Sequence, residues 1–287
     1  MTTVIAVANV KGGVGKTTTC LSLGGSLAEA GHSVMLVDLD PQAHLTISLG
    51  VKPESLRRTI GDVLLGQGTL VAMSQETKVA NLDLVPANNE LVIIDKVLYG
   101  RPGYEYRLRE GLEHSHFQPY DMILFDCPPA VGTLTLNALT AADFLLIPFQ
   151  CEYYAIRSLQ QVLELVLMVR RKTNPRLSYR LLVTMFDVRN KIHRVLLERV
   201  QARFPDALLQ SIIQIDTRLR ESPAFGLPVT QHAPQSRAAQ QYRELAQELL
   251  ALPRPATAPA RGDSLPLSEA LRRLVPSRQS VADAPAS

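Results

Sequence analysis

The stretch ANVKGGVGKTTT, close to the N-terminus, places glycines, lysines and threonines at the spacing of a phosphate-binding loop. In the standard pattern, G-x-x-x-x-G-K-[ST], the last three positions are matched by Gly15, Lys16 and Thr17. Val10 replaces the first glycine of that pattern, and Lys11 brings a second lysine into the loop. The spacing therefore predicts a nucleotide site with two cationic side chains.

The residue types of this loop suit a nucleoside triphosphate bound together with a magnesium ion. Lys16 is placed to neutralise β- and γ-phosphate oxygens, the Thr17 hydroxyl to bind Mg²⁺, and Thr18 to bond an α-phosphate. The loop follows an apolar run and opens a helical pattern, a context in which backbone N–H groups and the helix dipole hold anions. Three glycines let the backbone approach the anion: Gly12, Gly13 and Gly15.

Three aspartates end apolar runs elsewhere in the chain. Asp38 and Asp40 close SVMLVDLD, and Asp126 closes DMILFD. A single aspartate after a strand is most simply a cap for a turn or a helix. Three of them beside a phosphate loop favour a site for a magnesium ion or an attacking water.

Apolar β-branched runs alternate with helical patterns along the chain, and these elements must bring the loop and the aspartates together. The predicted strands cover residues 3–9, 33–40, 81–87, 120–129, 143–150 and 179–187. The predicted helices cover residues 18–31, 103–115, 132–141, 154–173, 190–204 and 236–252. Strands that are apolar on both faces and separated by helices indicate an α/β fold with a mostly parallel sheet covered by helices on both faces.

A change of composition near Pro253 divides the chain into two predicted parts. Residues 1–251 form one folded domain, and residues 252–287 form a Pro- and Ala-rich tail that we expect to be disordered. Within the tail, residues 265–275 (LPLSEALRRLV) make a short amphipathic stretch with two arginines and few leucines. Such a stretch is a weak membrane anchor, and docking on a partner or pairing with a second copy stay open.

The charge of the chain is divided unevenly, although its net value is +3. Residues 1–164 carry 11 Lys and Arg against 17 Asp and Glu, whereas residues 165–251 carry 14 against 7. A basic C-terminal section favours a polyanionic partner. Arginines that merely solvate exposed helix faces are the alternative.

The cysteine positions and the hydropathy of the chain limit the kinds of protein that it could be. The three cysteines, Cys20, Cys127 and Cys151, lie far apart in the sequence. This pattern predicts a reduced, cytoplasmic protein without disulfides or a cysteine-built metal site. No apolar run reaches the roughly 18 to 20 residues needed to cross a bilayer. The N-terminal residues show no signal-segment pattern.

The strings KGGVGKTT, VDLDPQ and DCPP together resemble the deviant-Walker ATPases, namely the ParA/Soj and MinD proteins and their relatives. The resemblance continues through LNALTAADFLLIPFQCEYYAIRSL, LLVTMFDVRNK and TRLRESPAFGLPV, covers residues 3–250, and is closest to the ParA/Soj branch. It implies a P-loop NTPase fold of the SIMIBI type, with ATP and Mg²⁺ as cofactors and slow hydrolysis of ATP to ADP and phosphate. In this family the lysine at the place of Lys11 reaches across a homodimer, in which two ATP molecules are sandwiched, to the partner's nucleotide. The loop then lacks its first glycine because the backbone there carries a side chain aimed at the partner.

The resemblance also implies roles for individual residues. The residues implied as catalytic are Lys11, Lys16 and Asp40. Asp40 matches the aspartate that positions or activates the attacking water, and Asp38 supports the same network. The residues implied at the metal are Thr17, Asp40 and Asp126, the last acting through water. The residues implied to bind the nucleotide are Lys11, Gly12, Gly13, Val14, Gly15, Lys16, Thr17, Thr18, Asp38, Pro41 and Met185.

The base-recognition segment departs from the family pattern. The ParA/Soj branch has an Ile-Pro-Arg-Asn run before an Arg-Leu pair, where this chain reads IQID from Ile213 to Asp216. Gln214 and Asp216 are still able to hydrogen-bond a base edge, so we predict both as nucleotide contacts. Adenosine stays the predicted nucleoside.

The resemblance gives the basic section a role as well. Arginines that match Arg189 and Arg218 carry sequence-independent DNA binding by the ATP-bound dimer in the Soj branch, and Lys191, Arg194 and Arg220 join them as predicted DNA contacts. Binding through phosphates alone requires no recognition helix and no aromatic stacking, which suits a chain without Trp. The implied protein is a cytoplasmic, nucleoid-associated ATPase that positions or segregates DNA or another cargo. A ParB-like or cargo-bound activator stimulates its hydrolysis.

Two other functions stay open at this point. A MinD-like membrane-cycling ATPase requires the tail to bind lipid. A metabolic P-loop enzyme requires substrate-binding residues beyond the nucleotide site, and the sequence offers none that we can identify. The basic section favours the DNA-based switch over both.

Overall fold

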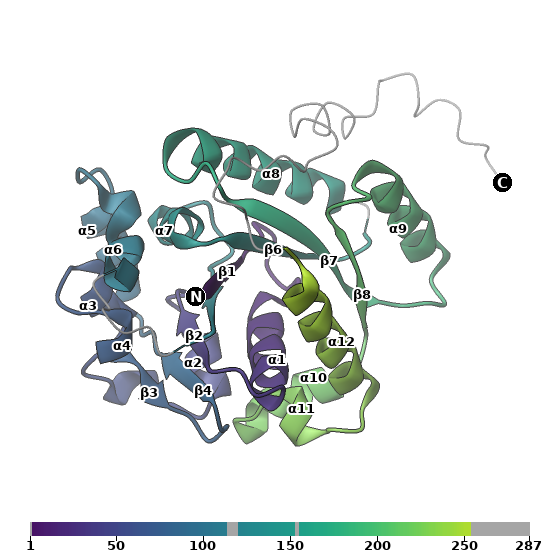
Figure 1. Cartoon of the computed structure of the whole chain (residues 1–287), viewed down its shortest axis with the longest axis horizontal. Coiled ribbons are helices and arrows are strands. Elements are labelled where there is room, and N and C mark those ends of the chain that lie inside the picture. Colours follow the sequence, from purple (N-terminus) through teal and green to yellow (C-terminus); the bar gives the residue numbers. More distant parts are fainter. Residues whose placement is uncertain (1, 114–119, 153–154, 254–287) are drawn as a thin grey trace.

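The centre of the fold is an eight-stranded sheet, seen in a computed structural model that describes residues 2–113, 120–152 and 155–253 (Figure 1). The strands are β1 (Thr3–Val7), β2 (Val34–Asp38), β3 (Gln75–Glu76), β4 (Leu82–Val85), β5 (Met122–Asp126), β6 (Phe144–Phe149), β7 (Ser178–Phe186) and β8 (Leu208–Gln214). Their order is β3-β4-β2-β5-β1-β6-β7-β8, and every neighbouring pair is parallel except β3 and β4. The predicted fold class, an α/β protein with a mostly parallel sheet, is confirmed.

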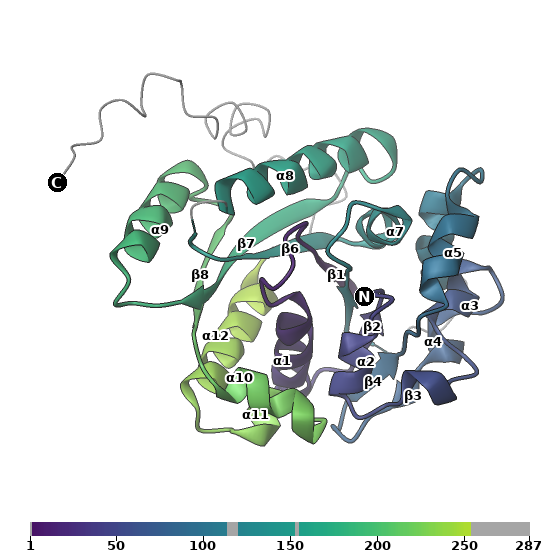
Figure 2. The same cartoon turned by 180° about the vertical axis from the view of Figure 1, so that it is seen from behind.

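Helices cover both faces of this sheet (Figures 1 and 2). One face carries α1 (Lys16–Glu29), α2 (His44–Ser48), α10 (Arg218–Glu221), α11 (Val229–His232) and α12 (Arg237–Ala251). The other carries α3 (Ile60–Leu64), α4 (Leu70–Met73), α5 (Leu91–Leu98), α6 (Arg107–Glu113), α7 (Thr133–Ala141), α8 (Ala155–Lys172) and α9 (Lys191–Arg203). Short 3₁₀ turns occupy Pro53–Ser55, Tyr104–Tyr106 and Ser222–Phe225.

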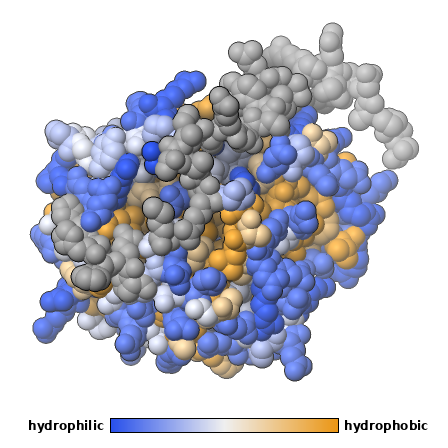
Figure 3. All heavy atoms as spheres, in the orientation of Figure 1, coloured by the Kyte–Doolittle hydropathy of each residue, from blue (hydrophilic) through white to orange (hydrophobic). Residues whose placement is uncertain are grey.

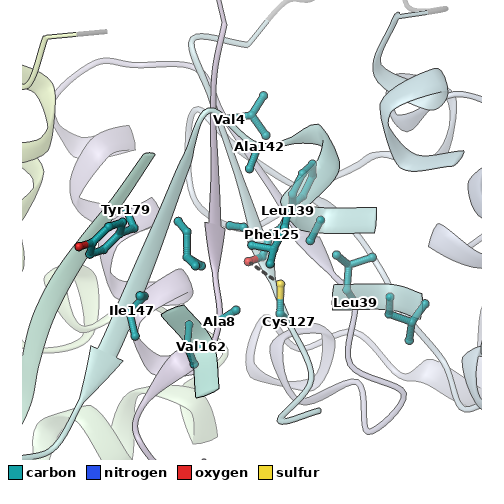
Figure 4. Packing of buried hydrophobic residues seen from close by; sticks show 14 of the residues in the cluster. Val4, Ala8, Leu39, Phe125, Cys127, Leu139, Ala142, Ile147, Val162 and Tyr179 are labelled. Atoms are coloured by element: carbon teal, nitrogen blue, oxygen red, sulfur yellow. Dashed lines mark hydrogen bonds between the residues drawn. The ribbon is translucent and has the colours of Figure 1, made fainter. Parts of the chain in front are cut away.

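Each central strand contributes to two hydrophobic layers, because successive side chains point to opposite faces of a strand. In β1, Val4 and Ala6 pack beneath α7 and α8, whereas Ile5 and Val7 pack beneath α1 and α12. Figure 4 shows part of the first layer, in which Cys127 is enclosed by apolar side chains. Burial raises the pKa of the Cys127 thiol, which makes this cysteine a packing residue and a poor nucleophile.

Several elements differ from the sequence prediction. The helix predicted over residues 103–115 begins as a 3₁₀ turn, since Gly103 has a left-handed φ of +70°, and continues as α6. Strand β8 was not predicted, because its polar residues interrupt the apolar pattern. Two of them, Gln210 and Ser211, bond their backbone N–H groups to Glu248 of α12. The helices of four to eight residues, such as α2 and α5, are shorter than the roughly 11 residues over which helical periodicity can be recognised.

The edge of the sheet where the parallel strands begin is partly apolar. Figure 3, in the orientation of Figure 1, shows apolar side chains in the middle of the molecular surface at this edge of the sheet. A cavity of about 140 Å³ lies there between the start of β6, at Phe144, and the end of α12, at Leu249 and Leu252. Within the described residues, no helix combines the length and the hydropathy that a membrane crossing requires. The tail stretch 265–275 lies outside the described residues.

Candidate active site

The phosphate loop joins β1 to α1 at the edge of the sheet where the parallel strands end. Figure 2 shows this loop from that edge. Gly13 and Gly15 adopt left-handed φ values of +74° and +86°, which suit residues without a Cβ atom, and Gly15 forms the N-cap of α1. The free N–H groups of the first turn of α1 therefore open onto the loop, where an anion gains both hydrogen bonds and the helix dipole.

Lys16, the first residue of α1, lies beneath the loop with 7% of its surface exposed. Its ammonium group donates one long hydrogen bond, of 3.4 Å, to the carbonyl oxygen of Lys11. Burial lowers the pKa of Lys16, and the charge of Asp126 opposes that shift. A buried ammonium with one weak acceptor gains strongly from further oxygen ligands, as a phosphate supplies.

The second lysine of the loop bonds within its own chain. Lys11 Nζ donates to Gln150 Oε1 at 3.1 Å and forms an ion pair with Glu152. Its backbone N–H donates to Asn9 Oδ1 at 3.0 Å. Val10, which stands where the standard pattern has glycine, packs against the core as a partly buried residue. The predicted position of Lys11 at a partner's nucleotide stays a prediction.

Asp38 and Asp126 end the neighbouring strands β2 and β5 in register with each other. Asp38 is fully buried, and one of its carboxylate oxygens accepts the backbone N–H of Asp40 at 3.0 Å. The other oxygen accepts the backbone N–H of Thr46 at 2.9 Å and the Thr46 hydroxyl at 2.7 Å. Burial raises the pKa of Asp38 to about 6 despite these bonds. Asp38 thereby holds the turn that carries Asp40.

Asp126 is a buried carboxylate with both oxygens available to a ligand. Neither of its carboxylate oxygens has a well-aligned hydrogen-bond partner in the described part of the chain. Burial, followed by the charge of Asp38, raises its pKa well above the usual range, and the nearby Thr17 hydroxyl opposes this in part. Orphaned carboxylate oxygens beside a hydroxyl and a second carboxylate, that of Asp40, are the donor set that a hard cation prefers.

Magnesium fits these residues without a larger carboxylate cluster. The described residues contain no group of three or more Asp, Glu, His or Cys side chains that could hold a metal. Mg²⁺ characteristically takes about one or two carboxylates and completes its shell with phosphate oxygens and waters. Asp40 is 8% exposed, and one of its carboxylate oxygens accepts the backbone N–H of Gln42 at 2.9 Å. Its other oxygen accepts no hydrogen bond from the described residues.

A cavity of about 340 Å³ extends from the phosphate loop between the ends of β7 and β8. Gly15 and Thr18 line its loop end. The predicted contacts Met185, Gln214 and Asp216 all line the cavity as well. Of the other predicted contacts, Asp38 ends β2 and Pro41 lies in the turn after it, and neither lines this cavity.

Several further residues line this cavity that the sequence did not indicate. They are Gln150, Glu152, Thr184, Asp187, Asn190, His193, Ile213, Ile215, Leu219 and Tyr242. Tyr242 comes from α12, far along the chain, and its hydroxyl lies 3.2 Å from the Thr19 hydroxyl of α1. No local signal marks such residues, because tertiary packing alone brings them to the loop.

Comparison with known proteins identifies the family. A family model described as "AAA domain" matches residues 2–179. The sporulation initiation inhibitor protein Soj of Bacillus subtilis is 40% identical over 249 residues, which cover 86% of this chain and 98% of Soj. The chromosome partitioning protein ParA of Caulobacter vibrioides is 39% identical over 249 residues, covering 86% of this chain and 93% of ParA. The chain belongs to the ParA/Soj family of partition ATPases.

A solved structure similar to this ParA/Soj-family chain contains the two predicted cofactors. It is named cobyrinic acid a,c-diamide synthase, comes from Mycobacterium smegmatis, and holds an ATP analogue and magnesium. It is 39% identical, with a TM-score of 0.76, and the match covers 87% of this chain and 95% of the other. The P-loop NTPase fold that the ParA/Soj resemblance implied is thereby confirmed.

The predicted DNA contacts of this ParA/Soj-family chain lie in two segments beside the cavity. Arg189, just before α9, donates two hydrogen bonds to the carboxylate of Asp187, of 3.0 and 3.1 Å. Arg218, the first residue of α10, donates to Glu221 at 2.7 Å. Each of these two arginines is therefore paired with a carboxylate of its own segment.

The other predicted DNA contacts flank these pairs. Lys191 and Arg194 belong to α9, and Arg220 belongs to α10 and also lines the cavity. Arg194 donates to the carbonyl oxygen of Val188 at 2.7 Å, which fixes the turn before α9. All five basic residues are exposed, and both segments follow the neighbouring strands β7 and β8.

Three basic residues of the C-terminal section lie apart from that surface. Arg170, Arg171 and Lys172 form the last turn of α8, which precedes β7 at the opposite edge of the sheet. Arg170 donates to the carbonyl oxygen of Leu177 at 2.6 Å and stacks over the Tyr179 ring. The basic C-terminal section therefore does not form one continuous surface.

Proposed function

We propose that this chain is an ATP-dependent, dimer-forming ATPase switch that binds DNA non-specifically and positions or segregates DNA or another cargo. The observation that carries the proposal is the buried pair of Lys16 and Asp126 beneath a phosphate loop that contains a second lysine, Lys11. Kinship with Soj and ParA supports the positioning role. A ParB-like or cargo-bound activator on another chain completes the cycle.

Nucleotide binding follows from the charges around the loop. The N–H groups of the first turn of α1 and the Lys16 ammonium hold the phosphates, and the cavity beyond Thr18 receives the nucleoside. Thr17, Asp126 and Asp40 hold Mg²⁺, which supplies charge neutralisation at the phosphate oxygens when bound. Asp40, carried by the turn that Asp38 fixes, orients the attacking water.

Dimer formation supplies the last catalytic group. Lys11 of one copy leaves its contacts with Gln150 and Glu152 and reaches the nucleotide of the second copy. A cation that stabilises the transferring phosphoryl group from a neighbouring chain is worth about 10³–10⁵ in rate in related switches. Hydrolysis therefore follows dimer formation, which makes the protein a timed switch.

DNA binding is assigned to the two basic segments beside the cavity. Arg189, Lys191, Arg194, Arg218 and Arg220 contact phosphates without reading bases, which places the protein on the nucleoid. Dimerisation doubles these contacts. Affinity therefore depends steeply on ATP and on salt, since each neutralised phosphate releases counterions.

Binding of non-specific duplex DNA, measured with ATP, ADP or no nucleotide across a salt series, tests this function. We expect binding with ATP alone, weakened by salt, lost in Arg218→Ala and retained in Arg58→Ala. Arg58 is a suitable control because it is also exposed but lies near the Pro53–Ser55 turn. Absence of binding with every nucleotide would remove the DNA role. Co-sedimentation with anionic liposomes would then test the MinD-like alternative.

A second candidate has one observation in its favour, the name of the Mycobacterium smegmatis relative, which describes a diamide-forming synthase. An enzyme of that kind consumes ATP in step with the amide product, whereas a switch releases phosphate without any acceptor. Phosphate release by the purified chain, with DNA and with no carboxylic acid or amine substrate, separates the two. Release that requires an acid and an amine would favour the synthase.

A further inference from the structure

The cavity beyond the phosphate loop leaves the recognition of the base to few polar groups. Its loop end is formed by Gly15 and Thr18, so a nucleoside bound there extends toward the segments after β7 and β8. The cavity as a whole exposes more apolar than polar surface, and Ile213, Ile215 and Leu219 are among its lining residues. In a cavity of this kind, a few placed donors and acceptors set the specificity.

Two polar residues of the cavity are already committed to the backbone. One carboxylate oxygen of Asp216 accepts the N–H of Arg218 at 3.0 Å, and the other accepts the N–H of Ala238 at 3.3 Å. Asn190 caps α9, since its side-chain oxygen accepts the N–H of Ile192 at 3.0 Å. Asp216, a predicted base contact, therefore shapes the loop and is a poor reader of the base.

One ring nitrogen of His193 forms a hydrogen bond within the protein, and the other is free to bond a ligand. Its Nδ1 accepts the backbone N–H of Asp187 at 3.0 Å, and its ring packs against Phe186 with centroids 5.7 Å apart. Because Nδ1 is the acceptor, the proton of the neutral ring resides on Nε2. Within the described residues, Nε2 has no hydrogen-bond partner, and His193 is part of the cavity wall. The ring therefore presents a fixed donor.

Gln214, at the end of β8, offers a complementary group. Its backbone N–H donates to Gln241 Oε1 at 3.0 Å, which fixes the main chain at this point. Its side-chain amide bonds no other described residue and lines the same cavity as His193. A free carboxamide pairs with an adenine edge by accepting from the N6 amino group and donating to a neighbouring ring nitrogen.

We propose that His193 and Gln214 read the nucleobase, with His193 Nε2–H donating to one ring nitrogen of adenine and the Gln214 amide pairing with the N6 edge. The inference rests on the proposed nucleotide-binding function and deepens it, since it assigns base specificity to two residues. Neither residue belongs to the phosphate loop, since His193 lies in α9 and Gln214 ends β8. Their loss is therefore expected to weaken binding of the base while phosphate binding at Lys16 persists.

The test measures binding of ATP and of 1-, 3- and 7-deaza-ATP, each of which replaces one ring nitrogen with C–H. The wild type is expected to bind two of the three about 3- to 10-fold more weakly than ATP, the fold-change of one lost hydrogen bond in each case, because His193 and Gln214 contact different ring nitrogens. His193→Phe, which keeps an aromatic ring against Phe186, should bind ATP about 3- to 10-fold more weakly than the wild type does. It should no longer distinguish ATP from one of those two analogues and should still distinguish ATP from the other. Gln214→Ala should lose most of its preference for ATP over ITP, which lacks the amino group.

Inorganic tripolyphosphate separates this inference from the proposed function. Binding of tripolyphosphate should be unchanged in His193→Phe and lost in Lys16→Ala. If His193→Phe weakened ATP binding but kept the wild-type discrimination among the analogues, His193 would act through the Asp187 turn and the inference would be wrong. Failure of the wild type to bind either ATP or tripolyphosphate would instead refute the nucleotide site itself.

Discussion

Replacing Asp126 with asparagine should stabilise the nucleotide-free protein while damaging its response to magnesium. The carboxylate of Asp126 is fully buried without a well-aligned hydrogen-bond partner among the described residues, and the charge of Asp38 lies next to it. An amide of the same shape removes the buried charge. Function at this position is therefore expected to cost stability, as strained active sites commonly do.

The pKa of the neighbouring Asp38 carboxylate indicates the size of the expected gain in stability. The pKa of Asp38 rises from 3.8 to about 6, and a shift of about two pKa units corresponds to roughly 3 kcal/mol. Asp126 is buried to the same extent and lacks the three bonds that favour the charged form of Asp38. After allowance for the unsatisfied amide, we expect a gain of about 1–3 kcal/mol at pH 8.

The gain should depend on pH with a definite sign. A carboxyl group whose pKa is raised in the folded state costs no stability below its unfolded pKa, and the cost grows as pH rises to the folded value. The stability advantage of Asp126→Asn should therefore be larger at pH 8 than at pH 5. Urea denaturation without nucleotide at both pH values measures it, with the exposed Glu54→Gln as a control expected to change stability by less than about 0.5 kcal/mol.

Ligand binding completes the test. Magnesium and ATP should raise the melting temperature of the wild type by mass action. In Asp126→Asn the part of that increase that requires magnesium should be lost. An Asp126→Asn protein that is less stable than the wild type at pH 8, or equally changed at both pH values, would refute the reasoning.

Three further predictions concern packing, a buried hydrogen bond and the second lysine. Gly25→Ala should lose about 1–3 kcal/mol in urea denaturation, because its Cβ would lie 2.4 Å from the rigid Pro228 ring; an unchanged midpoint would contradict this. Tyr242→Phe should lose about 1 kcal/mol in the same assay, since it leaves the buried Thr19 hydroxyl without its partner at 3.2 Å. Lys11→Ala should lose ATP-dependent dimerisation and hydrolysis, measured by analytical ultracentrifugation and phosphate release, and retention of both would overturn its proposed role.

The residues at the phosphate end of the site could be predicted because they are marked by patterns of residues close together in the sequence. The loop spacing identifies Lys16 and Thr17 directly. The apolar runs before Asp38 and Asp126 place both at strand ends, and parallel pairing then brings those ends together in register. The main strands could be predicted for the same reason, since each is a continuous apolar run.

The far end of the cavity could be predicted only in part. Met185 and Gln214 line it as expected, but the remaining geometry depends on contacts between distant segments. The sequence marks Asp216 as a polar residue in the right segment, but the Ala238 N–H that engages it comes 22 residues later. His193 shows no motif, and its availability depends on how Nδ1 meets the backbone of Asp187. Charge counting likewise grouped Arg170 with Arg189, although the two lie at opposite edges of the sheet.

The carboxylates paired with Arg189 and Arg218 already engage part of each guanidinium group. On the proposed function, a DNA phosphate competes for these guanidinium groups with Asp187 and Glu221, which are attached two and three residues away in the chain. Such a tethered competitor shortens the residence at any one phosphate without reducing the number of contacts. Each arginine would therefore dissociate rapidly from any one phosphate and bind a neighbouring one, which would let the protein move along DNA.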